Sequence, residues 1–268
     1  MSDYDVTYNP RYQRNKRWRE SQNAFSRAGQ GGNTTRNEMQ PNALPITQSL
    51  IAWFDFSDLG VAAVKSDGDK IPSVFDRSGS GNHATQTTEA AKPQLKLAIK
   101  NGLAVARFDG VNHYLTTRPV WMQKTQTIFG VMKHNVEPAG LANAFGTILI
   151  NTWGMWVDAG LLTLQAYTDG GAFFETQSGI SVGVWYILCG VRRMTELHNY
   201  ANDQSAGPTA ITGTPVEAQS TIAVGAGQTT ATYRLNGDLG EVLIYNEALN
   251  DSDRVLVLNY LNSKWSVY

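Results

Sequence analysis

Two glutamates and one serine motif are the residues whose spacing comes closest to a catalytic arrangement. Glu241 and Glu247 are six positions apart, with an apolar stretch and Asn246 between them, which does not supply the pair of facing carboxylates that glycoside hydrolysis uses. Residues 179–183 fit the pattern G-x-S-x-G, but a nucleophilic serine there needs a strand-to-helix turn and a later acid and histidine. His198 is the only histidine that follows. We therefore predict a hairpin turn at residues 179–183 and a protein that is not an enzyme.

Metal-binding patterns are weak in this sequence. No two histidines have the H-x-x-x-H spacing and none has a cysteine partner, so we predict no zinc site. Calcium needs several oxygen ligands, and aspartates in turns either supply such oxygens or accept hydrogen bonds from their own backbone. We favour the turn role and predict no cofactor. Calcium is the alternative at five aspartates, Asp67, Asp69, Asp76, Asp109 and Asp238.

Three tryptophans are candidates for stacking against a sugar ring. Trp121, Trp153 and Trp156 fall in or near predicted loops and strand ends, where an exposed indole face could contact a glycan. Aromatic side chains also fill sandwich cores and subunit interfaces. Trp153 and Trp156 are three positions apart, which would place them on opposite faces of one strand. Both roles stay open.

An N-terminal segment, residues 1–45, differs from the rest of the chain in charge and composition. It has seven Lys and Arg against four Asp and Glu, a net charge of +3 that leaves −4 for the remainder of a chain with a total of −1. It contains almost no aliphatic residues, and the sequences GQGGN and PNALP interrupt regular structure. We predict an extended arm that docks on a partner through Arg11, Tyr12, Arg14, Lys16, Arg17, Trp18, Arg19 and Phe25.

Alternating cations and aromatic rings in the arm suit two kinds of partner. They could neutralise phosphates and stack on bases, or anchor the arm on a protein surface through guanidinium groups and rings. The body of the chain, with its net charge of −4, would repel nucleic acid. An extended arm also contacts many neighbours at once in an assembly. We predict a protein partner and no nucleic acid.

The composition favours a large β domain. Among 268 residues, 17% are charged and 25 are glycine, which suits many short strands and turns better than long helices. Cys189 is the single cysteine, which excludes an internal disulfide, and its apolar neighbours indicate a packed core thiol. No run reaches the roughly 18 apolar residues of a membrane span, and no N-terminal signal pattern is visible. We expect a protein made in the cytoplasm, without a membrane partner.

Apolar runs recur along the chain at the spacing of short strands and turns. Many strands at this spacing predict a two-sheet sandwich or a barrel. The predicted strands are residues 49–56, 103–108, 127–133, 146–150, 154–157, 161–167, 185–191, 196–201, 221–225, 231–235 and 241–245, with a further strand beginning at 114–115.

The last thirty residues predict a strand followed by a helix that starts at a defined cap. In the strand at 241–245, Val242 and Ile244 share one face, and Leu243 and Tyr245 share the other. Asn250 occupies the expected N-cap position of a helix over residues 251–265, with Asp253 three positions later. We predict that the helix packs through one apolar stripe of four residues, Val255, Leu258, Leu261 and Trp265.

Four blocks in this order resemble the concanavalin A-like, laminin-G-like jelly-roll domains. They are W-x-D-F-S-D at 53–58, D-x-S-G-x-G-N-H-A at 76–84, R-F-D-G-x-x-x-Y-L at 107–115, and the C-terminal strand and helix. The resemblance covers residues from about 50 to 265. It implies an all-β, two-sheet antiparallel jelly-roll sandwich with a short C-terminal helix, in residues 46–268. Many such domains carry calcium at the rim of the sandwich. The glucanases among them carry an E-x-D-x-E strand, which this chain lacks.

The extended arm and the resemblance together lead to one functional prediction and two alternatives. We predict a non-enzymatic virion structural protein, a bacteriophage capsid decoration or head-fibre protein made in the host cytoplasm and present in several copies or as a homo-oligomer. Its arm would bind the major capsid protein or another virion protein. The first alternative is a lectin-like carbohydrate-binding module for attachment to a host or a glycan. The second is a degenerate glycoside hydrolase.

Overall fold

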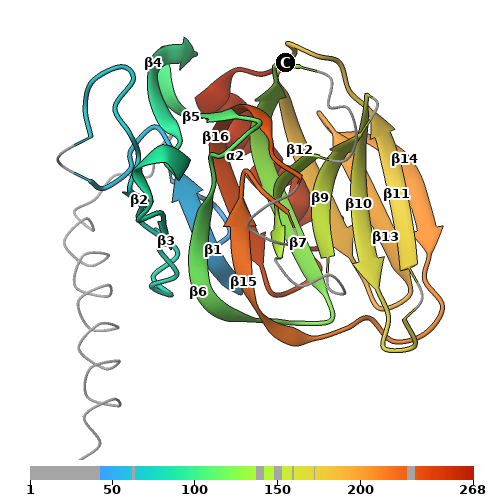
Figure 1. The fold of residues 1–268 in the computed structure, drawn as a ribbon. Coiled ribbons are helices and arrows are strands. Elements are labelled where there is room, and N and C mark those ends of the chain that lie inside the picture. Colours follow the sequence, from blue (N-terminus) through green and yellow to red (C-terminus); the bar gives the residue numbers. More distant parts are fainter. Residues whose placement is uncertain are drawn as a thin grey trace, which may run out of the picture. The chain divides into compact units, whose positions relative to one another are not determined.

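The computed structural model describes residues 43–61, 64–136, 142–147, 153–158, 160–171, 173–227 and 233–268. The chain divides into two units, Met1–Gln40 and Pro41–Tyr268, and all of the described residues lie in the second. That unit is a two-sheet antiparallel sandwich with one C-terminal α-helix (Figure 1), which confirms the predicted fold class. No helix among the described residues is long and apolar enough to cross a membrane.

Each sheet has eight strands in the described part of the chain. Sheet A has the order β14-β13-β12-β7-β16-β5-β4, with β1 also paired to β16, and sheet B has the order β11-β10-β9-β8-β15-β6-β3-β2. The strands of sheet A are β1 (Leu50–Asp55), β4 (Gln94–Lys100), β5 (Leu103–Asp109), β7 (Gln126–His134), β12 (Tyr186–Arg192), β13 (Glu196–Ala201), β14 (Gln204–Ala210) and β16 (Asn236–Tyr245). Those of sheet B are β2 (Ser73–Val74), β3 (Ala84–Thr85), β6 (Leu115–Met122), β8 (Ala142–Thr147), β9 (Trp153–Asp158), β10 (Leu161–Tyr167), β11 (Phe173–Gly179) and β15 (Ala218–Val224). A 3-10 turn, η1 (Glu89–Ala91), precedes β4.

Strand β16 is the centre of sheet A. One edge pairs with β7 along nearly its whole length, while the other pairs first with β5 and then with β1. The register with β7 shifts between Leu239 and Glu241, so a bulge at Gly240 turns Glu241 to the outer face of the sheet. Gly240 has no side chain there because an added Cβ would lie 2.8 Å from the ring of Trp265.

Sheet A separates two hydrophobic cores, one on each face. Val242 and Ile244 pack in the core between the sheets, and Leu243 and Tyr245 pack in a second core under helix α2 (Asp251–Trp265). This alternation confirms the predicted faces of the strand. The molecule therefore has three layers, sheet B, sheet A and α2, with α2 behind the sandwich in Figure 1.

Helix α2 begins at the predicted cap. The Oδ1 atom of Asn250 accepts a hydrogen bond from the Asp253 N–H at 2.9 Å, which satisfies one of the free donors of the first turn. The predicted stripe is correct at three of four positions. Val255 is only half-buried, and its place is taken by Val257, because the second core wraps around the helix toward that side.

Several sequence predictions of β structure need correction. Strands β2, β3, β4, β11 and β14 were not predicted, and β8 begins at Ala142, earlier than the predicted strand at 146–150, whose last three residues lie outside the described residues. The described part of the predicted strand at 231–235 is irregular, and β16 starts at Asn236. Residues 179–183 do not form a hairpin turn, because β11 lies in sheet B and β12 in sheet A. They connect the two sheets.

Candidate functional site

The serine of the G-x-S-x-G run does not lie in a nucleophile elbow. It follows the end of β11, and the next element is strand β12 rather than a helix. Its backbone N–H donates to the hydroxyl of Tyr186 at 3.1 Å, so the loop is fixed as a connection. His198 lies on β13, where its Nε2 is 2.9 Å from the Glu196 carboxylate.

Each of the five aspartates considered for calcium accepts hydrogen bonds or pairs with a cation in the fold. Among the described residues, no group of three or more His, Cys, Asp or Glu side chains could hold a metal ion. Asp109 accepts hydrogen bonds from three backbone N–H groups of its own turn, which is the predicted turn role. Asp76 accepts two such bonds from its own loop and a third from the Trp53 N–H of β1. Asp69 accepts two such bonds. Asp67 accepts one and pairs with a lysine, and Asp238 pairs with Arg107 and Lys133.

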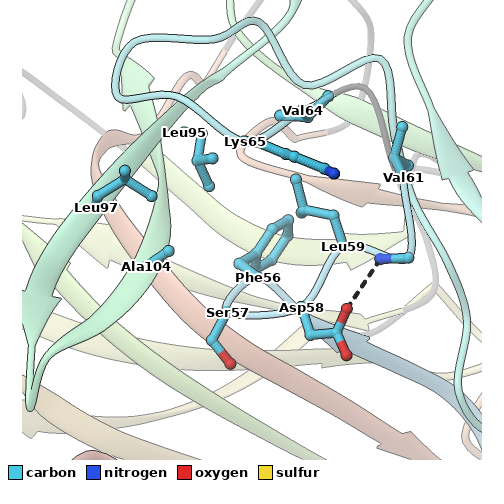
Figure 2. A pocket seen from close by; sticks show the side chains of 11 residues that line it. Phe56, Ser57, Asp58, Leu59, Val61, Val64, Lys65, Leu95, Leu97 and Ala104 are labelled. Carbon is cyan, nitrogen blue, oxygen red and sulfur yellow. Dashed lines mark hydrogen bonds between the residues drawn. The ribbon is translucent and has the colours of Figure 1, made fainter.

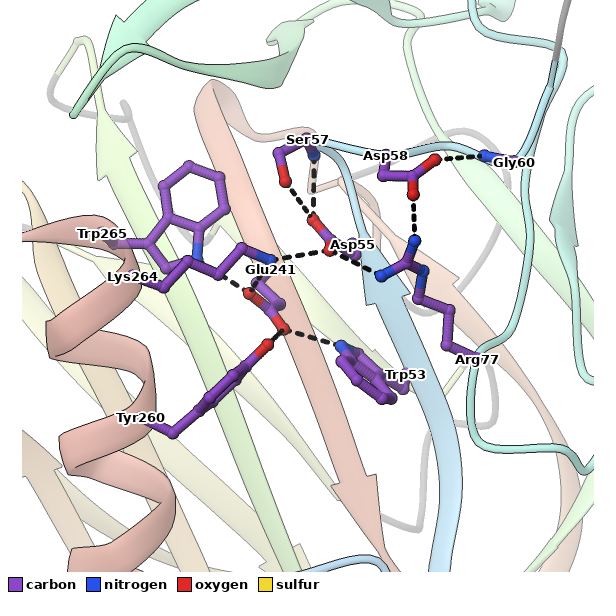
Figure 3. Close-up of polar contacts among 10 residues, drawn as sticks. All are labelled: Trp53, Asp55, Ser57, Asp58, Gly60, Arg77, Glu241, Tyr260, Lys264 and Trp265. Atoms are coloured by element: carbon purple, nitrogen blue, oxygen red, sulfur yellow. Dashed lines mark hydrogen bonds and ion pairs between the residues drawn. The ribbon is translucent and has the colours of Figure 1, made fainter. Parts of the chain in front are cut away.

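A buried carboxylate, Glu241, fixes the helix to the sheet, a role that no sequence pattern predicted. Glu241 is fully buried and accepts four hydrogen bonds (Figure 3). Its Oε1 accepts from Trp53 Nε1 at 2.6 Å and from the Tyr260 hydroxyl at 2.9 Å. Its Oε2 accepts from Trp265 Nε1 and Lys264 Nζ, each at 2.8 Å. With both oxygens taken by four donors, Glu241 joins β16, β1 and α2 and is not available as a general base.

The same lysine links Glu241 to a second acid. Lys264 Nζ lies 2.7 Å from Oδ2 of Asp55, whose side chain is 3% exposed. Arg77 pairs with Asp55 at 3.1 Å and also with Asp58 (Figure 3). Burial raises the pKa of Glu241, and Lys264 acts in the opposite direction. This charge network therefore holds β16 and α2 together, and its role is structural.

His113 forms a smaller polar cluster at the start of β6. Its Nε2 is 3.2 Å from Lys70 Nζ and 3.4 Å from Asp109 Oδ2. Burial lowers the pKa of His113, Asp109 raises it and Lys70 lowers it further. The neutral imidazole is therefore favoured in the folded protein.

The outer face of sheet B carries buried polar atoms that lack partners. Met155 and Val157 belong to the core between the sheets, so Trp156 between them faces outward. Trp156 pairs in register with Thr163 of β10. Both residues are buried, at 6% and 1% exposure, and neither the indole Nε1 nor the hydroxyl has a hydrogen-bond partner among the described residues. Two unsatisfied polar atoms side by side are costly to a fold.

Tyr233, which no sequence pattern indicated, completes this site. Its ring meets the ring of Trp156 edge-on, with centroids 5.4 Å apart and planes at 86°. It is 36% exposed, and its φ of 60° is a left-handed conformation that costs a non-glycine residue on the order of 1 kcal/mol or more. We call Trp156, Thr163 and Tyr233 the Trp156 patch. Its chemistry is aromatic and neutral: two rings, one indole N–H donor and the hydroxyls of Thr163 and Tyr233.

The three predicted tryptophans do not form one platform. Trp121 on β6 is 51% exposed on the same outer face, but β15 and β8 separate its strand from β9. Trp153 pairs in register with Ala166, and its side chain lies outside the described part. Their roles in glycan contact stay predictions, as does that of Trp156. The eight arm residues, Arg11, Tyr12, Arg14, Lys16, Arg17, Trp18, Arg19 and Phe25, also lie outside the described residues.

Comparison with known proteins agrees with this architecture. Residues 132–253 match the family model of the concanavalin A-like lectin/glucanases superfamily. This match confirms the predicted resemblance. A search of curated proteins finds no match.

Solved structures with the same fold include clostridial toxin domains. The binding domain of Paraclostridial Mosquitocidal Protein 1 matches with a TM-score of 0.59 and 12% identity, over 80% of this chain and 52% of that one. The botulinum neurotoxin serotype D binding domain gives 0.59 and 11%, over 80% and 51%. The serotype D domain solved in complex with N-acetylneuraminic acid gives 0.58 and 12%, over 80% and 51%. This chain spans about half the length of these structures, and at such identities the likeness is one of fold.

Proposed function

We propose that this domain is a lectin-like carbohydrate-binding module and that the Trp156 patch contacts the sugar. The observation that carries the proposal is the pair of buried, unpartnered polar atoms on Trp156 and Thr163 beneath an exposed tyrosine. Sugar hydroxyls are both donors and acceptors, so they would satisfy the indole N–H and the threonine hydroxyl together. The fold shared with binding domains, one of them solved with N-acetylneuraminic acid, supports a binding role.

Access to the patch depends on Tyr233. Its left-handed backbone conformation stores strain, and a bound sugar that let the backbone relax would recover part of that free energy. A ring 36% exposed beside a buried indole also provides the apolar face that binding pockets combine with a few polar groups. We therefore infer that the sugar enters beside Tyr233 and reaches the two polar atoms below it.

A glycan array probed with the full chain tests the proposal. Thr163→Val keeps the shape of the side chain and removes the unsatisfied hydroxyl, so the variant should be as stable as the wild type or more stable. It should nevertheless bind the selected glycan about tenfold more weakly, the loss expected for one hydrogen bond of about 1.4 kcal/mol. Tyr233→Ala should bind still more weakly.

Trp121→Ala is the matched control, because Trp121 is an exposed aromatic residue on the same face outside the patch. It should bind like the wild type. If no glycan binds, or if only Trp121→Ala loses binding, the proposed site is wrong. A loss of stability above about 1 kcal/mol in Thr163→Val would show that the hydroxyl has a partner in the fold.

The virion role stays a second proposal, carried by the charge and aromatic content of residues 1–45. A decoration protein that lacks this arm should fold but fail to join its particle, whereas a lectin without it should keep its glycan. Deletion of residues 1–45, followed by particle co-sedimentation and by the glycan assay, separates the two. Normal particle assembly by the truncated protein would contradict the anchoring role.

A further inference from the structure

A cleft of about 470 Å³ opens beside strand β4, far along the chain from the Trp156 patch (Figure 2). Phe56 and Leu59, which follow β1, line it and also belong to the core between the sheets. Leu95 of β4 is a third core residue in the lining. The cleft is thus a place where the sandwich core reaches the surface, and its volume falls in the range of small-molecule sites.

The cleft exists because the two sheets differ in extent on this side. Strands β2 and β3, at the edge of sheet B, have only two residues each, while sheet A continues to the seven-residue strand β4. The register of β4 with β5 shifts between Lys96 and Lys100, and Ala98 has a φ of 52°. This bulge accompanies a bend of the strand that leaves Leu97 41% exposed at the edge of the cleft.

One cation at the cleft is available to a ligand. Lys65 lines the cleft, and Figure 2 shows its side chain lying over it beside Val64. Its Nζ has no hydrogen-bond or ion-pair partner among the described residues. The other charged lining residue, Asp58, already accepts from the Gly60 N–H and pairs with Arg77. The unbalanced charge at this apolar cleft is therefore positive.

We propose that this cleft binds the acyl chain of an aliphatic carboxylate, with the carboxylate beside Lys65. The chain would cover apolar surface of Leu97, which is exposed, and of Val61 and Val64, which are partly exposed, and burial of apolar area is the main driving force for such a ligand. The carboxylate would stay near solvent at the mouth, where pairing with a lysine has no large desolvation cost. This binding is independent of the glycan site.

Isothermal titration of the full chain with decanoate and with decanol tests the proposal. Decanoate should bind with saturation at one site, and decanol more weakly. Lys65→Met keeps the length of the side chain and removes the charge. It should weaken decanoate binding about fivefold, the factor for an exposed ion pair of about 1 kcal/mol, and leave decanol unchanged. Lys100→Met, on the same strand as Leu97 but outside the cleft, is the control and should bind like the wild type.

A second variant tests the position of the acyl chain. Leu97→Ser alters an exposed side chain, so the protein should fold normally and bind both decanoate and decanol more weakly. The proposal is overturned if decanoate shows no saturable binding. It is equally overturned if Leu97→Ser binds both probes like the wild type, or if Lys65→Met binds decanoate as tightly as the wild type does.

Discussion

Removing the Lys264 ammonium should destabilise the protein more than any surface charge change. In Lys264→Met, two buried carboxylates lose the cation that lies 2.7 Å from Asp55 and 2.8 Å from Glu241. Their side chains are 3% and 0% exposed, so water cannot replace the lost charge. Breaking a buried ion pair costs about 3 to 5 kcal/mol. Asp55 keeps Arg77 as a partner at 3.1 Å, which places the expected loss at the lower end, about 3 kcal/mol.

Urea denaturation followed by tryptophan fluorescence measures this loss, since Trp53 and Trp265 both bond to Glu241. Lys124→Met, a change at a partly exposed lysine after β6, is the control and should stay within about 0.5 kcal/mol of the wild type. The difference in unfolding free energy between the wild type and Lys264→Met should shrink as the pH falls. The pKa of Glu241 is already raised by burial, and without the lysine it rises further. As the pH falls, Glu241 is therefore protonated earlier in the variant than in the wild type, and this removes the uncompensated buried charge.

Two results would refute this reasoning. A loss below about 1 kcal/mol at neutral pH would mean that the ion pair is not buried in the folded protein. A deficit that grows as the pH falls would mean that the two acids are not the charges that Lys264 compensates.

Three further predictions concern single residues. Burial raises the pKa of the Cys189 thiol, so Ellman's reagent should react with it only after unfolding, and rapid reaction of the native protein would contradict its place in the core. Because the folded-state pKa of His113 is lowered from 6.5, its contribution to stability is present above that value and is lost as the pH falls. Urea titrations between about pH 8 and pH 5 should therefore show that His113→Gln loses less unfolding free energy on acidification than the wild type does. Equal losses in the two proteins would refute this. Gly240→Ala would place a Cβ 2.8 Å from the Trp265 ring, so it should cost about 1 to 3 kcal/mol by chemical denaturation, and a neutral effect would show that the helix does not rest on this glycine.

Much of the scaffold could be predicted from the sequence because local patterns encode it. Strand β10 and strand β13 have their predicted bounds, and the Asn250 cap is formed as expected. Strand β14, in contrast, reads QSAGPTA. Its side chains are mostly exposed at the edge of a sheet, so apolar alternation could not mark it. Its strand conformation comes from pairing with the neighbouring strand β13, which its own residue pattern does not indicate.

The candidate site was harder to predict because its parts are distant in the sequence. Trp156 was selected as an aromatic residue near a strand end, but only strand register places Thr163 beside it. Tyr233 approaches from a loop more than seventy residues away in the chain, and no local pattern links it to Trp156. Glu241 was considered only as a catalytic partner of Glu247, because its four donors come from β1 and α2, outside its own strand. An apolar strand containing one acid, followed by a helix with Tyr, Lys and Trp, was the available signal.

The indole N–H resonances of the full-length protein test the central claim most directly. In a protein labelled with ¹⁵N-tryptophan, Trp156→Phe identifies the Trp156 signal among those of the seven tryptophans. Titration with a glycan selected on the array should shift the Trp156 Nε1–H signal, since that N–H lacks a partner among the described residues, and leave the Trp121 signal in place. A glycan that binds while the Trp156 signal stays fixed would contradict the account.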